Sequence, residues 1–129
     1  WRLGEARKTL EFVEQVAGEE PAILMGDFNA LPDSEEISLL LQAGFVDAFT
    51  AAGAGAGITW HETGNPNIRL QRETYPDEVP QDPPDKRIDF VFVRGQGLQV
   101  REAKVVLEQP LEGRYASDHY GVLARVRVR

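Results

Sequence analysis

Three short clusters of polar residues in this chain could carry chemistry. The first, Gly26-Asp27-Phe28-Asn29, places a carboxylate and an amide two residues apart, so both point the same way in extended backbone. Such a pair can hold a water molecule or a phosphate oxygen from two sides. The same residue types form turns, and a simple turn is an equally good interpretation. A calcium loop is rejected because the Gly and Glu that it needs at positions six and twelve are absent.

The second cluster is Arg87-Ile88-Asp89-Phe90-Val91-Phe92-Val93. In a strand, Asp89 shares a face with Val91 and Val93, where a carboxylate must be paired because burying it alone is costly. Two partners are open for Asp89: its neighbour Arg87, in a structural ion pair, or a histidine that it would hold in one tautomer. The chemistry of the residues alone favours Arg87.

The third cluster is Ser117-Asp118-His119-Tyr120-Gly121, at the start of a predicted strand. Histidine suits proton transfer because its usual pKa lies near neutrality. A lone histidine is more often structural than catalytic, and an adjacent aspartate improves the functional interpretation only in part. The other histidine of the chain, His61, lies at the edge of a long polar segment and is interpreted as incidental.

The elements that must position these clusters follow from periodicity and breakers. Apolar residues at helical spacing predict an amphipathic helix over Arg2–Ala17, which Gly18 ends. The apolar run 22–25 predicts a buried strand. A second helix is expected from a cap at Asp33 or Ser34 up to Gly44.

The second half of the chain is predicted to be richer in strands. Residues 51–57 are interpreted as a Gly/Ala-rich loop and 58–60 as a short extended piece, and His61–Lys86 is expected to be a long loop. Strands are predicted at 87–93, 100–107 and 121–128. The expected fold class is α+β, with a mixed, mostly antiparallel sheet and helices packed on one face.

The order of these motifs is more specific than any one of them. A buried strand ending in Gly-Asp-Phe-Asn, then Thr59-Trp60, Arg-Ile-Asp-Phe and Ser-Asp-His-Tyr, resembles the second half of the endonuclease/exonuclease/phosphatase superfamily, which has the pancreatic deoxyribonuclease-like fold. The resemblance runs over nearly the whole chain and is to bacterial-type members of broad specificity. It implies a divalent-metal-dependent phosphoesterase (a phosphodiesterase, nuclease or phosphatase) that hydrolyses its substrate by in-line attack of water.

The resemblance also implies roles for single residues. Asp27 is similar to the carboxylate that positions or deprotonates the attacking water, and Asn29 to the residue that contacts the scissile phosphate. Asp89 resembles the carboxylate that orients a histidine. His119 resembles the histidine that binds and polarises the phosphate or handles its proton, and Asp118 resembles the carboxylate at or near the metal. Thr59-Trp60 matches a mainly structural landmark.

The same resemblance predicts that residues 1–129 are a single partial domain, the C-terminal half of a four-layered sandwich. The cofactor implied is Mg²⁺ or Mn²⁺, but the glutamate that is the family's principal ligand cannot be placed in this chain. The chain alone is therefore expected to be inactive, because one or two carboxylates rarely hold Mg²⁺. An exposed sheet face is expected to bind the missing N-terminal half or another copy. The alternative function is a non-catalytic half-domain that binds phosphate or a partner.

Composition and charge limit the kinds of chemistry and the classes of partner that this chain can have. The chain has 129 residues, a net charge of −7 and no cysteine, which excludes a disulfide framework and a thiolate nucleophile. Its acidity makes nucleic acid possible as a substrate but not favoured, since polyphosphate is repelled at long range. The apolar runs are too short to span a membrane, and no secretory signal follows residue 1. A soluble protein is expected, with the cytoplasm favoured and secretion still open.

Overall fold

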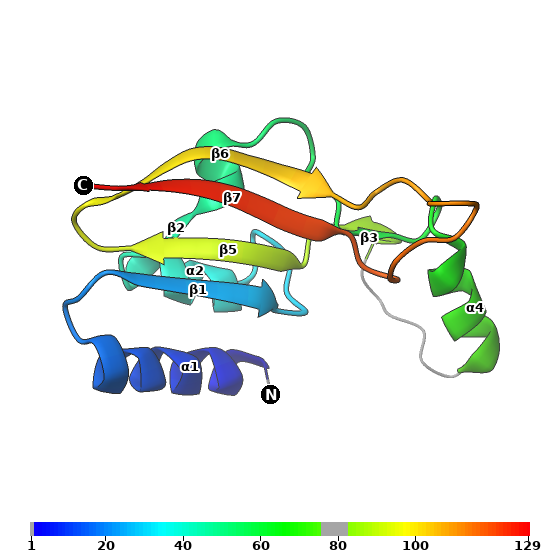
Figure 1. The fold of residues 1–129 in the computed structure, drawn as a ribbon. Helices are drawn as coiled ribbons and strands as arrows, with labels where there is room; N and C mark the ends of the chain where they lie inside the picture. The colour runs from blue at the N-terminus through cyan, green and yellow to red at the C-terminus, as the bar shows by residue number, and fades with distance from the viewer. Residues whose placement is uncertain (1, 76–82) are drawn as a thin grey trace.

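The computed structural model describes residues 2–75 and 83–129 (Figure 1). The chain has an α+β fold in which the helices and strands alternate irregularly, and all described strand pairs are antiparallel. In chain order the elements are α1 (Arg2–Ala17), β1 (Ala22–Asp27), α2 (Glu35–Gln42), β2 (Val46–Asp47), α3 (Ala48–Ala52), β3 (Trp60–His61), α4 (Pro66–Thr74), β4 (Asp85–Lys86), β5 (Asp89–Arg94), β6 (Leu98–Val106) and β7 (Gly121–Val128).

The strands of the described residues form three small sheets. The first has the order β1-β5-β2, the second pairs β3 with β4, and the third is the β6–β7 hairpin. In the first sheet the register places Ile23 opposite Val93 and Asp27 opposite Asp89. Because directly paired residues of an antiparallel sheet point to the same face, the two aspartates emerge together at one end of that sheet.

Helices α1 and α2 cover one face of the first sheet. Phe90 and Phe92 of β5 point to that face and are almost fully buried, with Ile37 and Leu40 of α2. Leu10 and the apolar side of α1 pack against the same cluster. Burying each of these large side chains contributes about 1.5–3 kcal/mol, so this core fixes β5 firmly between its neighbours.

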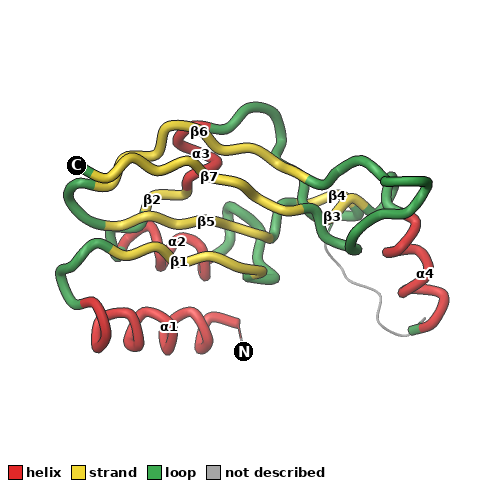
Figure 2. Tube along the Cα trace, in the orientation of Figure 1, coloured by secondary structure: helices red, strands yellow, loops and turns green. Residues whose placement is uncertain are grey.

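The opposite face of β5 meets the β6–β7 hairpin. Val91 packs in a second cluster with Ala103 of β6 and with Ala48 and Phe49 of α3. Val122 and Ala124 of β7 pack against this cluster. Figures 1 and 2 show the hairpin running alongside β5, with α3 beside β6. The strand that carries Asp89 is therefore held between two layers.

Several predicted boundaries are confirmed. Helix α1 spans the predicted residues, and Gly18, with φ of 50°, follows it. Of the two caps considered for α2, Ser34 is the one used: its Oγ accepts from the backbone N–H of Ile37 at 3.4 Å. Strand β7 also has its predicted bounds. Local periodicity and capping residues were sufficient signals for these elements.

Two predicted loops contain helices. Helix α3 begins before the Gly/Ala-rich stretch 51–57 and ends within it, and the predicted loop His61–Lys86 contains α4 and the short strand β4. Asn65 caps α4 by accepting from Asn67 N at 3.1 Å, and Pro66 occupies its first turn. This cap-and-proline pair is a recognised start signal that the composition of the segment had obscured. The acidic residues Asp77, Glu78 and Asp82 of the same predicted loop lie outside the described residues.

Part of the first sheet is open to solvent. On the face shared with Asp27 and Val91, the side chains of Ile23, Met25 and Val46 are 50%, 71% and 49% exposed. The hairpin packs against Val91 but leaves these three neighbours uncovered. Among the described residues, no helix combines the length and apolar character needed to cross a membrane.

Candidate functional site

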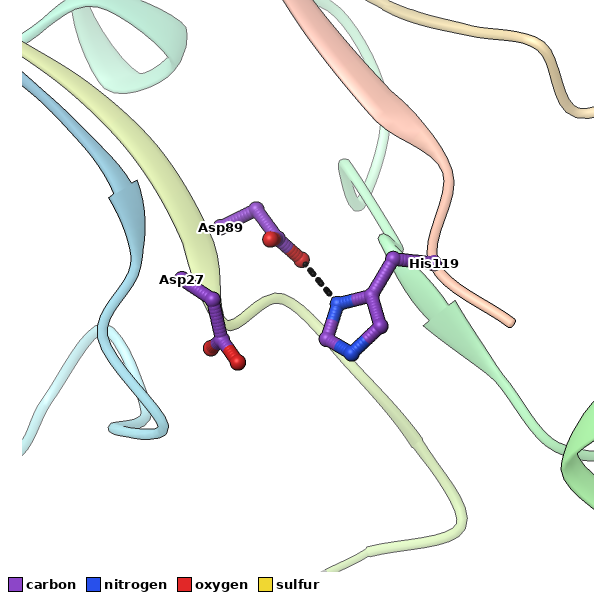
Figure 3. Close-up of side chains that lie close together, drawn as sticks. All are labelled: Asp27, Asp89 and His119. Carbon is purple, nitrogen blue, oxygen red and sulfur yellow. Dashed lines mark hydrogen bonds and ion pairs between the residues drawn. The ribbon is translucent and has the colours of Figure 1, made fainter. Parts of the chain in front are cut away.

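Three ends of the described strands meet at one place. Asp27 is the last residue of β1, Asp89 the first of β5, and His119 lies two residues before β7 (Figure 3). The paired register of β1 and β5 brings the two carboxylates together, and the hairpin brings the imidazole beside them. One potential ligand atom from each of the three residues lies within 4.8 Å of the others. Predicted site residues that are far apart in sequence are thus adjacent in the structure.

Asp89 and His119 form a hydrogen-bonded pair. The distance from His119 Nδ1 to Asp89 Oδ2 is 2.9 Å, and the side chains are only 24% and 18% exposed. The hydrogen bond to Asp89 raises the pKa of His119 above its usual 6.5, although burial acts the other way. The negative charges of Asp89, Asp27 and Asp118 add to the increase in this pKa. With Nδ1 bound to a carboxylate, Nε2 is left as the ring nitrogen that can exchange a proton with a ligand.

The prediction that Asp89 forms an ion pair with Arg87, which the residue types alone favoured, is wrong. Arg87 Nη1 instead lies 2.7 Å from Asp47 Oδ2 in a pair that is nearly inaccessible to solvent. The guanidinium of Arg87 also lies over the rings of Phe49 and Phe90. Asp47 lies forty residues earlier and could not be identified from local spacing. The Arg87–Asp47 pair leaves the Asp89 carboxylate to the histidine.

Asp27 and Asn29 form a compact turn of their own. The backbone N–H and the side-chain amide of Asn29 donate to the two carboxylate oxygens of Asp27, at 2.8 and 3.1 Å. Asn29 has a φ of 47°, in the left-handed region, where asparagine is among the better tolerated residues. Arg2 also reaches this turn, donating to the Asn29 carbonyl at 2.8 Å. The turn interpretation is correct, and the same turn presents the carboxylate at the site.

Thr59 joins the segment of Asp89 to that of His119. Its side chain is completely buried, and its Oγ1 accepts from the backbone N–H groups of Ile88 and Asp89 at 3.1 and 3.2 Å. The Thr59 carbonyl accepts from Tyr120 N at 2.7 Å. The next residue, Trp60, packs edge-on against the ring of His119, with centroids 4.9 Å apart. The Thr-Trp landmark therefore supports the site directly.

Two further residues singled out in the sequence lie beside this group. Asp118 accepts from Ser117 Oγ at 3.0 Å, and its carboxylate is not among the three clustered ligands. Its role at a metal stays a prediction. His61 contacts the hydroxyl of Tyr120 at 3.3 Å and Asp85 at 3.7 Å, also outside the group of Asp27, Asp89 and His119.

The donor set fits a divalent cation in part. Carboxylate oxygens of Asp27 and Asp89 are ligands that Mg²⁺ and Mn²⁺ prefer, and imidazole is accepted better by Mn²⁺ than by Mg²⁺. One oxygen of Asp89 is already engaged by His119, and both oxygens of Asp27 accept from Asn29. The described residues therefore supply only a fraction of the coordination shell that such a cation requires.

Comparison with known proteins gives a consistent picture. The sequence model of the Endonuclease/Exonuclease/phosphatase family matches residues 5–119. The crystal structure of the endonuclease/exonuclease/phosphatase from Bacteroides vulgatus matches 99% of this chain at 25% identity, with a TM-score of 0.71. This chain spans only 44% of the length of that protein.

Two more distant structures share the fold. D. rerio TDP2, complexed with single strand DNA product, matches 98% of this chain at 21% identity and a TM-score of 0.73, over 50% of its own length. The mannosyl-6-phosphatase Bt3783 of Bacteroides thetaiotaomicron matches 97% at 22% identity and a TM-score of 0.65, over 45% of its own length. No curated protein matches the chain.

Proposed function

Because this chain belongs to the Endonuclease/Exonuclease/phosphatase family, we propose that it carries the water-activating and phosphate-binding side of a phosphoesterase site. The observation that carries this proposal is the pair of Asp89 and His119, 2.9 Å apart, with the Asp27 carboxylate beside it. Hydrolysis of a phosphoester requires a base or anchor for water and donors aimed at the phosphoryl oxygens. These three side chains provide both functions within one small space.

The roles follow from the contacts of each group. Asp27 holds the attacking water and accepts its proton, while its own position is fixed by Asn29. An amide nitrogen carries two N–H groups, so Asn29 keeps a second donor for a phosphate oxygen. Protonated His119 offers Nε2–H to another phosphoryl oxygen as negative charge develops there. Asp89 fixes the tautomer of His119 and, by raising its pKa, keeps more of it protonated near neutrality.

The cation belongs to the same proposal. We place Mg²⁺ or Mn²⁺ at the acidic edge formed by Asp27 and Asp89, with Asp118 as a further ligand, where it would offset charge on the phosphoryl oxygens. The incomplete donor set supports the view that residues outside this chain, including a glutamate, complete the shell. Accordingly, we expect these 129 residues alone to show little or no turnover with either metal.

The catalytic proposal is tested in the longest natural polypeptide that contains this sequence. A panel of a small phosphodiester, a phospholipid head group and a sugar phosphate identifies the substrate class. Nucleic acid is not favoured as a substrate because the chain is acidic. His119→Ala should lower kcat by about 10²–10⁴-fold, the usual range for an acid–base group. His61→Ala is the matched control and should retain turnover. Undiminished hydrolysis by His119→Ala would refute the assignment.

A partner on the open sheet face is the second element of the proposal. Ile23, Met25 and Val46 are exposed on the sheet face that also carries Asp27, and the chain spans 44–50% of the length of the three structural relatives named above. Apolar side chains grouped on a sheet face mark an interaction surface, and we propose that the rest of the sandwich or another copy covers them. Met25→Lys should then reduce association in sedimentation. A wild-type chain that stays monomeric at high concentration contradicts this.

The alternative is a half-domain that binds phosphate or a partner without turnover. The partial donor set is the observation that favours it. Phosphate binding measured by calorimetry separates the two functions. Binding without hydrolysis in the longest polypeptide, with metal present, supports the binding module. Hydrolysis that depends on His119 supports the enzyme.

A further inference from the structure

Asn65 is a completely buried polar residue that lies outside the group formed by Asp27, Asp89 and His119. Its relative exposure is 0%, and its side chain is among the largest that are fully buried in the described residues. Burying an amide is costly unless its donors and its acceptor are satisfied. The oxygen and the nitrogen of the amide group both form hydrogen bonds, and their partners lie in two different parts of the chain.

The oxygen of the amide faces α4, and the nitrogen faces the site. Asn65 Oδ1 accepts from Asn67 N at 3.1 Å, which caps α4. Asn65 Nδ2 donates to the backbone carbonyls of Ser117 and Asp118, at 2.9 and 3.2 Å. One side chain thus ties the first turn of α4 to the two residues that directly precede His119, more than fifty positions later in the sequence.

We propose that Asn65 is a positioning residue of the site: its amide nitrogen fixes the Ser117–Asp118 backbone and so determines where the side chains of Asp118 and His119 stand. Other contacts also restrain this segment, because the ring of His119 is hydrogen-bonded to Asp89 and packs against Trp60. His119 N donates to the exposed Ser117 Oγ at 3.2 Å, and the next anchor is the bond from Tyr120 N to Thr59. The carbonyls of Ser117 and Asp118 are therefore both attached to one fully buried side chain, that of Asn65.

A cap alone would not require asparagine here. Ser34 caps α2 through a hydroxyl oxygen, and serine, aspartate and asparagine all serve that function well. Only an amide combines an acceptor for the helix with donors for two carbonyls. Aspartate would keep the cap but aim an oxygen at the carbonyls of Ser117 and Asp118. Serine would keep the cap and reach neither carbonyl.

The test uses these two substitutions in the chain of 129 residues, followed by amide hydrogen exchange. In Asn65→Asp and Asn65→Ser we expect the N–H groups of His119 and Tyr120 to exchange about tenfold faster or more, since two hydrogen bonds to the segment are lost. The amides of α4 should change little because the cap is retained. Ser34→Ala, which removes a cap from α2, is the matched control and should leave residues 117–120 unaffected.

Two results would overturn the proposal. One is exchange at His119 and Tyr120 that is unchanged in both Asn65 variants; the other is acceleration spread evenly over the whole chain, which indicates a purely structural role. If one variant does not fold, the other decides, because one preserves side-chain volume and the other avoids a buried charge. This readout requires no turnover, so it is independent of whether the proposed phosphoesterase function, on which the catalytic meaning of Asn65 rests, is correct.

Turnover gives the second readout in the longest natural polypeptide. Displacing His119 without removing it should lower kcat by about tenfold or more and leave KM nearly unchanged. A loss confined to KM contradicts positioning of the reacting groups. If wild type itself shows no hydrolysis, the proposed function fails, and the exchange experiment still decides the role of Asn65.

Discussion

Thr59 holds the backbone of Asp89: its buried Oγ1 accepts the Asp89 N–H at 3.2 Å and, at 3.1 Å, that of Ile88. Thr59→Val keeps the shape of the side chain but leaves two buried donors without an acceptor. We expect a loss of about 1–3 kcal/mol in the free energy of unfolding, measured by urea denaturation. Thr59→Ser should recover most of this loss because it restores the hydroxyl. Equal stability of the valine and serine variants would contradict this explanation.

The raised pKa of His119 predicts a pH-dependent contribution to stability. The folded state binds this proton more tightly than the unfolded state, because Asp89 accepts the hydrogen bond. The contribution is fully present below the unfolded pKa of about 6.5 and is lost as pH rises through the higher folded pKa. The stability difference between wild type and His119→Gln should therefore shrink with increasing pH. Urea denaturation at a series of pH values measures it, and a difference that grows with pH has the wrong sign.

The buried pair of Asp47 and Arg87 predicts a strong and asymmetric mutational effect. Asp47→Ala leaves the guanidinium of Arg87 buried with its principal partner removed, although Thr50 lies 3.4 Å away. We expect the free energy of unfolding to fall by about 3–5 kcal/mol. The double variant Asp47→Ala with Arg87→Met should be less destabilised than Asp47→Ala alone. Thermal or urea unfolding of the four proteins of this cycle provides the measurement.

Because the backbone of Asn29 is left-handed, substitutions at this position can separate the effect of backbone conformation from the effect of losing the side-chain amide. At its φ of 47°, alanine is strained whereas glycine is not. Asn29→Ala should be less stable than Asn29→Gly by about 1 kcal/mol, measured by denaturation. Both variants lose the amide that contacts Asp27 and that we propose contacts a phosphate oxygen, so turnover in the longest polypeptide should fall in both to a similar extent. Recovery of turnover by glycine alone would assign Asn29 a purely conformational function.

The sequence was most informative where a single segment contains its own signals. The apolar stripe of α1 ending at Gly18 and the alternation of β7 are examples, because their periodicity depends only on which face is buried. The two short helices, α3 and α4, could not be predicted in this way because periodicity is a weak signal in a short segment. Helix α3 has five residues and α4 has nine, too few for a clear periodic pattern.

The candidate site shows a similar division. The motifs around Asp27, Asp89 and His119 could be found from residue types, order and family resemblance, and the structure brings these three together. The residues that support this site could not be found from the sequence, because the contacts of Arg87 with Asp47 and of Asn65 with Ser117 join residues forty or more positions apart. Sequence spacing has no signal for such pairs, and packing alone decides them.

The hydrogen bond between His119 and Asp89 closes a loop of thirty residues and also depends on β1, which joins the sheet from far earlier in the chain. Contacts of such long range form only after the chain has met the entropic cost of bringing distant segments together. We therefore expect the site to form only when β1, β5 and the segment before β7 have come together. During refolding, a signal from the His119 ring should recover no earlier than the helical content.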